Sequence, residues 1–213
     1  ALIHDNTTYA KGLADWTEKF LKEKGATVVF NDAITPKEKD FTSTLTKIKG
    51  LDPEVIYFTG YFSEGGLLLR QARELGIKAV FMAGDANNNP DFVKNAGLEA
   101  AKGAIITTLP LPQDLPYKEA KQFIADYKAK YGKEPESIWT LTMADAFRVV
   151  VEAIEKTKST DPVKLAEYLH TQLKDFPGIT GPITFDEKGD RLGSVHTAYV
   201  VNEKGEFVLY KKQ

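Results

Sequence analysis

The chain has 213 residues, 42% of them hydrophobic and 27% charged, so it is long enough to bury one large core or two small ones. Its 28 basic and 30 acidic residues leave a formal net charge of -2, which gives no general attraction for nucleic acid or an anionic membrane. It contains no cysteine, which excludes disulfides, thiolate metal sites and a cysteine nucleophile.

Strands and helices alternate with a regular spacing in the first half of the chain. Predicted apolar strands lie at 1–5, 27–34, 54–60, 79–84 and 103–111, with helical patterns between them. The first helix is expected from Tyr9 to Lys24, with Leu13, Trp16 and Phe20 on one apolar face. The continuous apolar strands predict a parallel sheet covered by helices on both faces, which is a doubly wound α/β lobe.

The second helix has the most explicit start signal. Thr35-Pro36-Lys37-Glu38 matches a capping box with proline at the first helical position, and Phe41, Leu45 and Ile48 form the expected buried face. In the third helix, Gly65 and Gly66 predict a close approach to the sheet or to a ligand.

The pattern changes after a proline-rich stretch at 108–116, which reads as a linker. Helices are expected at 117–131, 137–157 and 161–172, and hairpins at 181–193 and 196–212. Three amphipathic helices with few strands to cover them make this half unbalanced.

Polar side chains follow the predicted strands at their carboxyl ends, which is where open parallel sheets bind ligands. They lie at Asp5 to Tyr9, at Asp32, at Thr59-Gly60-Tyr61 and at Asp85 to Asn89. Such an edge suits a small ligand with an ammonium group, with Asp85 as the counter-charge and Tyr9 and Tyr61 as walls and hydrogen-bond donors.

Each of these residues also has a structural interpretation. Tyr61 could pack over the sheet edge, Asp85 could cap a turn, and Tyr9 could be an ordinary residue of a first helical turn. For Asp5 and Asp32 the structural interpretation is favoured, because carboxylates after strands often cap the next helix.

Enzyme and cofactor signals are absent from the sequence. It has no dinucleotide, P-loop or nucleophile-elbow motif, so no cofactor is expected. His4, His170 and His196 lie far apart without metal-ligand spacing, so no metal site is expected either.

Four stretches, "HDNTTYAKG", "FTGYFSEGG", "FMAGDANNN" and "GPITFDEKGD", occur in an order that resembles the branched-chain amino-acid binding proteins of ABC importers. These are type I periplasmic binding proteins, in which two α/β lobes close on an amino acid. The resemblance implies that Tyr9 and Tyr61 line the ligand cleft together with Thr59 and Gly60, and that Asp85 holds the ammonium group. Aspartate stands where the family commonly has glutamate, and the family's second-lobe aromatic falls near 137–139.

The resemblance also implies that roughly 120 residues of a full-length member, a domain-sized segment with the loops that hold the ligand's carboxylate, precede the first residue. The expected domains are then a complete ligand-binding lobe, 1–110 plus 196–213, and a partial, mainly helical other lobe, 111–195. Helices without their sheet predict self-association into a homo-oligomer.

The function implied by the resemblance is non-catalytic binding of a branched-chain or related aliphatic amino acid for ABC-type uptake. The expected partners are the amino acid and a membrane permease, and the expected location is periplasmic or extracellular, with a membrane-attached lipoprotein as one form. A sensory or regulatory domain on the same scaffold is the alternative, and a flavodoxin-like enzyme is a third candidate without a supporting motif.

Overall fold

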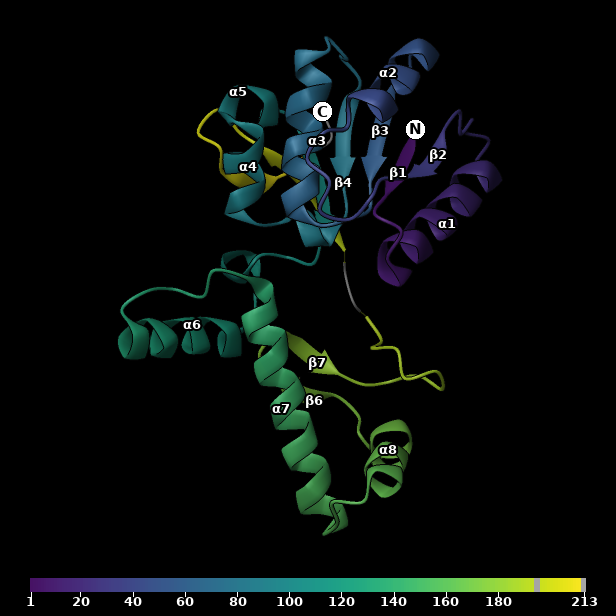
Figure 1. Cartoon of the computed structure of the whole chain (residues 1–213). Helices are drawn as coiled ribbons and strands as arrows, with labels where there is room; N and C mark the ends of the chain where they lie inside the picture. Colours follow the sequence, from purple (N-terminus) through teal and green to yellow (C-terminus); the bar gives the residue numbers. More distant parts are fainter. Residues whose placement is uncertain (194–195, 212–213) are drawn as a thin grey trace. The chain divides into compact units, whose positions relative to one another are not determined.

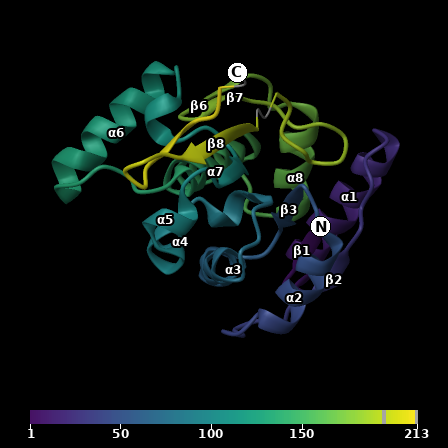
Figure 2. The same ribbon diagram turned by 90° about the horizontal axis from the view of Figure 1, so that it is seen from above.

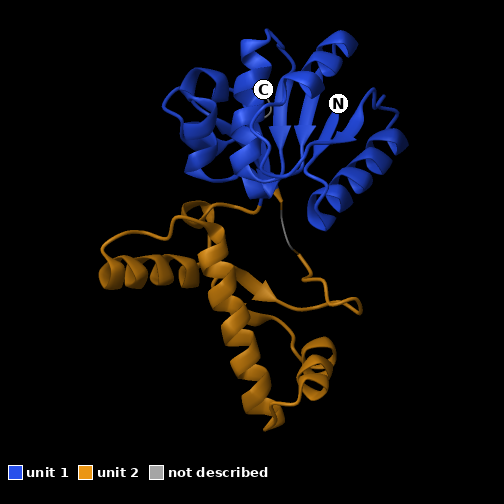
Figure 3. Cartoon of the chain, viewed as in Figure 1, with its two compact units in different colours: residues 1–108, 197–213 blue, residues 109–196 orange. Residues whose placement is uncertain are grey.

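The computed structural model describes residues 1–193 and 196–211 and divides the chain into two compact units (Figure 3). Unit 1 comprises Ala1–Thr108 and Thr197–Gln213, and unit 2 comprises Leu109–His196. The chain therefore leaves unit 1 once and returns to it once. None of the helices within the described ranges is both long and apolar enough to cross a bilayer.

Unit 1 is built on a seven-stranded sheet with the order β2-β1-β3-β4-β5-β8-β9 (Figure 1). Its strands are β1 (Leu2–His4), β2 (Asn31–Ala33), β3 (Val55–Phe58), β4 (Val80–Ala83), β5 (Ile105–Thr108), β8 (Thr197–Val201) and β9 (Phe207–Leu209). The first five strands pair in parallel, whereas β8 and β9 add an antiparallel hairpin at one edge. The predicted α/β fold with a mostly parallel sheet is confirmed.

Helices lie on both faces of this sheet (Figure 2). They are α1 (Thr8–Glu23), α2 (Thr42–Leu51), α3 (Phe62–Glu74), α4 (Pro90–Ala96), α5 (Leu98–Ala101) and the 3-10 turn η1 (Asp85–Asn87). The main core joins α2, α3 and α4 to one face of the sheet, and the predicted inward residues Phe41, Leu45 and Ile48 all belong to it. Burial of such side chains contributes about 1.5–3 kcal/mol each relative to exposure.

The opposite face of the sheet is less covered than the continuous apolar strands predict. β3 and β4 alternate between buried and partly exposed residues, and Val55 and Val80 are among the exposed large hydrophobic side chains. Among the described helices of unit 1, α1 covers this side, and its buried residues are the small Ala10 and Ala14.

The predicted apolar face of α1 is not its buried face. Trp16 and Phe20 are 56% and 51% exposed and stack on each other with ring centroids 5.6 Å apart. The spacing pattern identified a helical face, but spacing alone does not say which of two faces meets the sheet.

The predicted capping box does not start α2. Lys37 adopts a left-handed conformation, with φ 66°, and its backbone N–H donates to Glu64 Oε1 at 3.0 Å. Glu38 still accepts from the Thr35 N–H at 3.1 Å, as a capping box would. The contact from Lys37 to α3 interrupts the helix, so α2 begins at Thr42.

Unit 2 is mainly helical. It contains η2 (Pro112–Asp114), α6 (Lys118–Tyr131), α7 (Ile138–Thr157), α8 (Pro162–Thr171), β6 (Phe176–Gly178) and β7 (Gly181–Ile183). The three helices agree with the predicted spans. The expected hairpin over 181–193 is only partly formed, because β7 pairs with the preceding β6 and the later part contributes one isolated bridge, Phe185 to Arg191.

Two glycines in helices give a matched test of the packing on α3. A Cβ on Gly66 would lie 2.5 Å from the Phe92 carbonyl oxygen and 2.7 Å from Asn95 Cβ, whereas a Cβ on Gly12 in α1 would meet nothing within 4 Å. We expect Gly66→Ala to lower the free energy of unfolding by about 1–3 kcal/mol through overpacking. Gly12→Ala should raise it by up to about 1 kcal/mol through helix propensity. Urea denaturation of both variants checks this, and equal effects would contradict the packing shown here.

Candidate functional site

Three of the predicted site residues meet at the carboxyl edge of the parallel strands. Tyr9 comes from the first turn of α1, Tyr61 from the loop between β3 and α3, and Asp85 from the turn after β4. The Tyr9 hydroxyl donates to Asp85 Oδ1 at 2.5 Å, and the two tyrosine rings lie 5.6 Å apart with a tilt of 43°. The sequence separation of Tyr9 and Asp85 is 76 residues, so only the sheet brings them together.

This group of residues presents both an aromatic wall and a negative charge. Tyr9 and Tyr61 are 38% and 43% exposed, so their rings are accessible to a small molecule. Within the described part of the chain, no lysine, arginine or histidine forms an ion pair with Asp85. A cationic group that approaches Asp85 would gain a charge-assisted hydrogen bond beside two aromatic faces.

The bond between Tyr9 and Asp85 perturbs the tyrosine. Burial and the hydrogen bond to the Asp85 carboxylate, with the negative charge of that carboxylate, raise the pKa of Tyr9 well above its usual value. Tyr9 therefore stays a neutral donor over the physiological pH range.

Thr59 and Gly60, the other two predicted site residues, lie beneath this surface. The Thr59 hydroxyl is fully buried and donates to the Ala10 carbonyl at 2.7 Å, so it ties β3 to α1. Gly60 is buried as well, and a Cβ there would lie 2.4 Å from the Phe58 ring. The Thr59 side chain and Gly60 therefore support the loop from beneath and are not exposed to solvent.

No motif in the sequence predicted a role for Asn87, which lies beneath these loops. Asn87 is fully buried at the end of η1, and its side-chain amide donates to the Gly60 carbonyl at 2.8 Å and to the Gly84 carbonyl at 3.3 Å. Buried asparagines are unusual because each has four hydrogen-bonding sites to satisfy. No spacing rule in the sequence distinguishes Asn87 from the neighbouring Asn88 and Asn89.

The two other carboxylates at this edge have local partners, in line with the structural interpretation. Asp5 Oδ1 accepts from the Thr7 N–H and hydroxyl, at 3.0 and 2.7 Å. Asp32 Oδ1 accepts from the N–H of Ala33 at 2.8 Å. In the described residues, no group of three or more His, Asp or Glu side chains could hold a metal ion.

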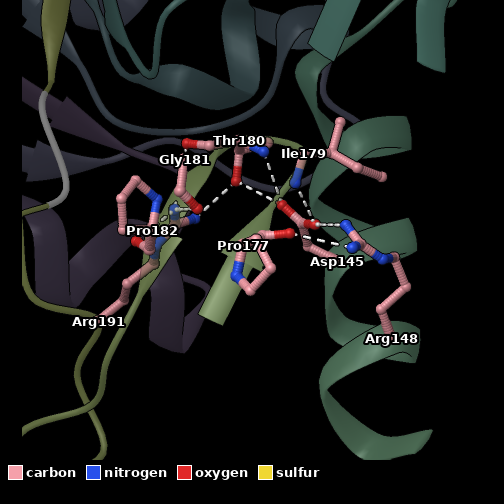
Figure 4. A network of polar contacts seen from close by, with 8 residues as sticks. All are labelled: Asp145, Arg148, Pro177, Ile179, Thr180, Gly181, Pro182 and Arg191. Atoms are coloured by element: carbon pink, nitrogen blue, oxygen red, sulfur yellow. Dashed lines mark hydrogen bonds and ion pairs between the residues drawn. The ribbon is translucent and has the colours of Figure 1, made fainter. Parts of the chain in front are cut away.

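Unit 2 contains a separate cavity of about 920 Å³ beside α7. Asp145 lies in its wall and is buried, with both carboxylate oxygens engaged by the turn between β6 and β7 (Figure 4). Oδ1 accepts from the Ile179 N–H at 2.6 Å, and Oδ2 accepts from the N–H and hydroxyl of Thr180 at 2.8 and 2.7 Å.

Two arginines complete this polar network. Arg148 lies 3.4 Å from Asp145, and Arg191 donates to the Thr180 hydroxyl and to the carbonyls of Thr180, Gly181 and Pro182. The network fastens the turn to the helix, and these polar groups are occupied by structural bonds. The rest of the cavity wall is mainly apolar. At the start of α7, Ser137 accepts from the Trp139 N–H as its cap, and Trp139 is exposed.

Comparison with known proteins gives a consistent result. Residues 1–206 match the family described as periplasmic binding protein. The chain is 35% identical over 199 residues to a leucine-, isoleucine-, valine-, threonine- and alanine-binding protein of Pseudomonas aeruginosa, covering 93% of this chain and 52% of that protein. It is 34% identical to the Leu/Ile/Val-binding protein of Escherichia coli K12, covering 91% and 50%.

Solved structures agree with the sequence comparison. The leucine-binding protein LivK of Thermotoga maritima superposes with a TM-score of 0.88 at 30% identity, over 99% of this chain and 59% of that one. The LivJ protein of Streptococcus pneumoniae in complex with isoleucine gives a TM-score of 0.77 at 30% identity, over 97% and 57%. The chain therefore spans about half the length of the curated relatives it matches.

The raised pKa of Tyr9 predicts a specific pH dependence of stability. The folded state holds the Tyr9 proton more tightly than the unfolded state, so the stabilisation is complete below the unfolded value of about pH 10 and declines as the pH rises above it. We expect Tyr9→Phe to lower the free energy of unfolding by about 1 kcal/mol at pH 7, a low value because Tyr9 is partly exposed. Above pH 10 the difference from the wild type should shrink.

Chemical denaturation at several pH values between 7 and 11 measures this difference. Tyr131→Phe on the exposed surface of α6 is the control, because no hydrogen-bond partner of its hydroxyl is seen among the described residues. A Tyr9→Phe difference that stays constant across this range would contradict the bond to Asp85.

Proposed function

The chain belongs to the periplasmic binding protein family, and we propose that its Tyr9–Tyr61–Asp85 surface is one side of a binding site for a branched-chain or related aliphatic amino acid. Periplasmic binding proteins are non-catalytic, so binding is the whole of the proposed activity. The observation that supports it most directly is the unneutralised Asp85 carboxylate beside two accessible tyrosine rings.

Each part of the amino acid has a proposed place. The ammonium group would bind Asp85, which no cationic side chain of the described residues neutralises, and the aliphatic side chain would pack on Tyr9 and Tyr61. None of the three loops carries a lysine or arginine, so the ligand carboxylate would meet backbone N–H groups or residues outside these loops. The names of the similar proteins, which bind leucine, isoleucine and valine, support the choice of ligand class.

The proposed mechanism is closure of two lobes on the ligand, followed by presentation to an ABC permease in the membrane. Unit 1 would be the complete lobe, and unit 2 would be part of the other one. A protein that works in this way acts outside the cytoplasmic membrane, either free or attached as a lipoprotein. Because this chain spans about half the length of its curated relatives, the site formed by unit 1 alone would bind weakly. The expected dissociation constant is in the millimolar range, which corresponds to a binding free energy of about -4 kcal/mol.

A thermal-shift and titration experiment tests the ligand and the role of Asp85. We expect leucine, isoleucine or valine at ten times the dissociation constant to stabilise the chain by about 1.4 kcal/mol, and glutamate or lysine to have no effect. Asp85→Asn removes the counter-charge while preserving the shape, so it should abolish the stabilisation. The control is Asp126→Asn on the exposed face of α6, which should respond as the wild type does.

Two outcomes would contradict this proposal. Stabilisation by amino acids that survives in Asp85→Asn would place the site elsewhere. The absence of any response up to the solubility limit of the amino acids would show that unit 1 does not bind them on its own.

We also propose that α7 mediates self-association. Trp139, Met143, Phe147 and Val150 are exposed along one side of this helix, and Met143 and Phe147 are 71% and 70% exposed. Their spacing of four, four and three residues aligns them over three turns. This stripe adjoins Thr142, Ala146 and Val149, which line the mainly apolar cavity.

The occupant we propose for this surface is a second copy of the chain. A helix with an uncharged stripe can pair with its own symmetry mate, because a two-fold interface uses the same patch twice. Aromatic side chains bury about 150–250 Å² each, so the stripe and the cavity rim supply a large share of the about 800 Å² per partner of a stable interface.

Sedimentation velocity over a concentration series tests this association. We expect the wild type to form dimers at micromolar concentration and the Met143→Asp/Phe147→Asp variant to remain monomeric. Leu51→Asp, which changes an exposed apolar residue at the end of α2, should dimerise as the wild type does. A monomeric wild type at all concentrations would overturn the proposal and would leave the face to another part of a longer protein.

A further inference from the structure

Asn87 occupies a position where an apolar residue would be expected. Its side chain is completely buried at the end of η1, between the loop after β3 and the first turns of α3. A Cβ on Gly65 would lie 2.1 Å from Asn87 Oδ1 and 3.1 Å from the Phe58 ring. Asn87 Oδ1 therefore lies against the backbone of α3, in a space that only a glycine at 65 leaves open.

The hydrogen bonds of Asn87 connect two loops that are distant in sequence. Nδ2 donates to the Gly60 carbonyl at 2.8 Å and to the Gly84 carbonyl at 3.3 Å. Gly60 directly precedes Tyr61, and Gly84 directly precedes Asp85. One amide group thus joins the peptide that leads into the aromatic wall to the peptide that leads into the carboxylate.

The bond to Gly60 acts on the orientation of Tyr61. The Gly60 carbonyl belongs to the peptide unit that links Gly60 to Tyr61, so a fixed carbonyl direction fixes the rotation of that unit. Tyr61 is the N-terminal cap residue of α3 and has no side-chain cap bond of its own, with φ -96° and ψ 161°. The contact with Asn87 therefore helps to set the direction in which the ring leaves the backbone, together with the bond from the Gly65 N–H to the Tyr61 carbonyl.

The Asn87 amide also carries a free-energy cost, because one of its polar atoms is buried without a hydrogen bond among the described residues. Asn87 Oδ1 has no hydrogen-bond partner in the described part of the chain, although it is buried. A leucine has the same branching and would carry no unpaired oxygen, but it is larger and would leave the Gly60 carbonyl without its donor. What the asparagine supplies and a leucine cannot is the pair of donors to the two loops.

We infer that Asn87 is a positioning residue of the binding site, which sets the direction of Tyr61 and its separation from Asp85 without itself touching the ligand. This inference rests on the proposed function for the ligand, but the coupling between the loops exists whether or not a ligand binds. Tyr9 then closes the arrangement from α1 through its hydrogen bond to Asp85.

Asn87→Leu tests the inference, because it keeps the branching of the side chain and removes both hydrogen bonds that the amide donates. We expect the dissociation constant for the amino acid to rise at least tenfold at a temperature well below the unfolding transition. The matched control is Leu45→Ala, a fully buried change in α2 that destabilises unit 1 without touching either loop. Its dissociation constant should stay within twofold of the wild type even though its melting temperature falls.

A second readout needs no ligand. With ¹³C-labelled tyrosine, the ring signals of Tyr9 and Tyr61 report their contact and the hydrogen bond to Asp85. In Asn87→Leu both signals should shift, and the pKa of Tyr9 should fall in the same direction as we expect in Asp85→Asn. In Leu45→Ala neither should change.

Asn87→Asp serves if the leucine variant does not fold, because the introduced side chain has the same shape and one oxygen in place of the donor. Burial raises the pKa of such a carboxyl, so it regains an O–H donor as the pH falls. We expect tighter binding and more native-like tyrosine spectra at pH 5.5 than at pH 8, a difference that the wild type does not show.

The outcomes separate this inference from the proposed function. If Asn87→Leu and Leu45→Ala weaken binding equally, Asn87 only stabilises the fold and the inference is wrong. If no amino acid binds the wild type, the proposed function fails for this chain, and the tyrosine spectra alone decide: unchanged spectra in Asn87→Leu overturn the inference, and shifted spectra support it.

Discussion

Parallel pairing of β1, β3 and β4 is the constraint on which the candidate site depends. Parallel strands bring their carboxyl ends to the same edge, and the three segments that follow these strands carry Tyr9, Tyr61 and Asp85. The register of the strands sets the spacing of the three loops. The glycines and buried polar groups beneath the loops fix the loop conformations. The exposed tips contain the groups that can meet a ligand, so chemistry and support are carried by different residues of the same loops.

Unit 2 is organised by a different interaction. The buried Asp145 carboxylate, with the turn bonded to it, fixes a two-stranded hairpin on α7. A buried charge is tolerable only when it is paired and hydrogen-bonded, and here three donors and an arginine meet that condition. Polar bonding thus secures the local fold of unit 2 beside its two small hydrophobic clusters.

Sequence patterns were sufficient where the determining contacts are local. The inward face of α2, the span of α8 and the pairing of β8 with β9 follow from spacing and turn residues. The patterns were insufficient where contacts between residues distant in sequence determine a helix start or a buried face. The contact from Lys37 to Glu64 displaced the start of α2, and α1 buried two alanines in place of its aromatic face. Asn87 differs from Asn88 and Asn89 through its hydrogen bond to Gly60, which the sequence does not reveal.

The return of the chain to unit 1 has a consequence for its synthesis and folding. β5 pairs with β8, with Ile105 opposite Val200 and Thr108 opposite Thr197. β8 follows the whole of unit 2 in the sequence, so β5 lacks this neighbour until unit 2 has been synthesised. Until then β5 presents unpaired backbone groups, which other chains can join. Contacts of such long sequence separation also slow folding. β1, β3 and β4, whose carboxyl ends lead to Tyr9, Tyr61 and Asp85, can therefore pair before β5 gains its second neighbour.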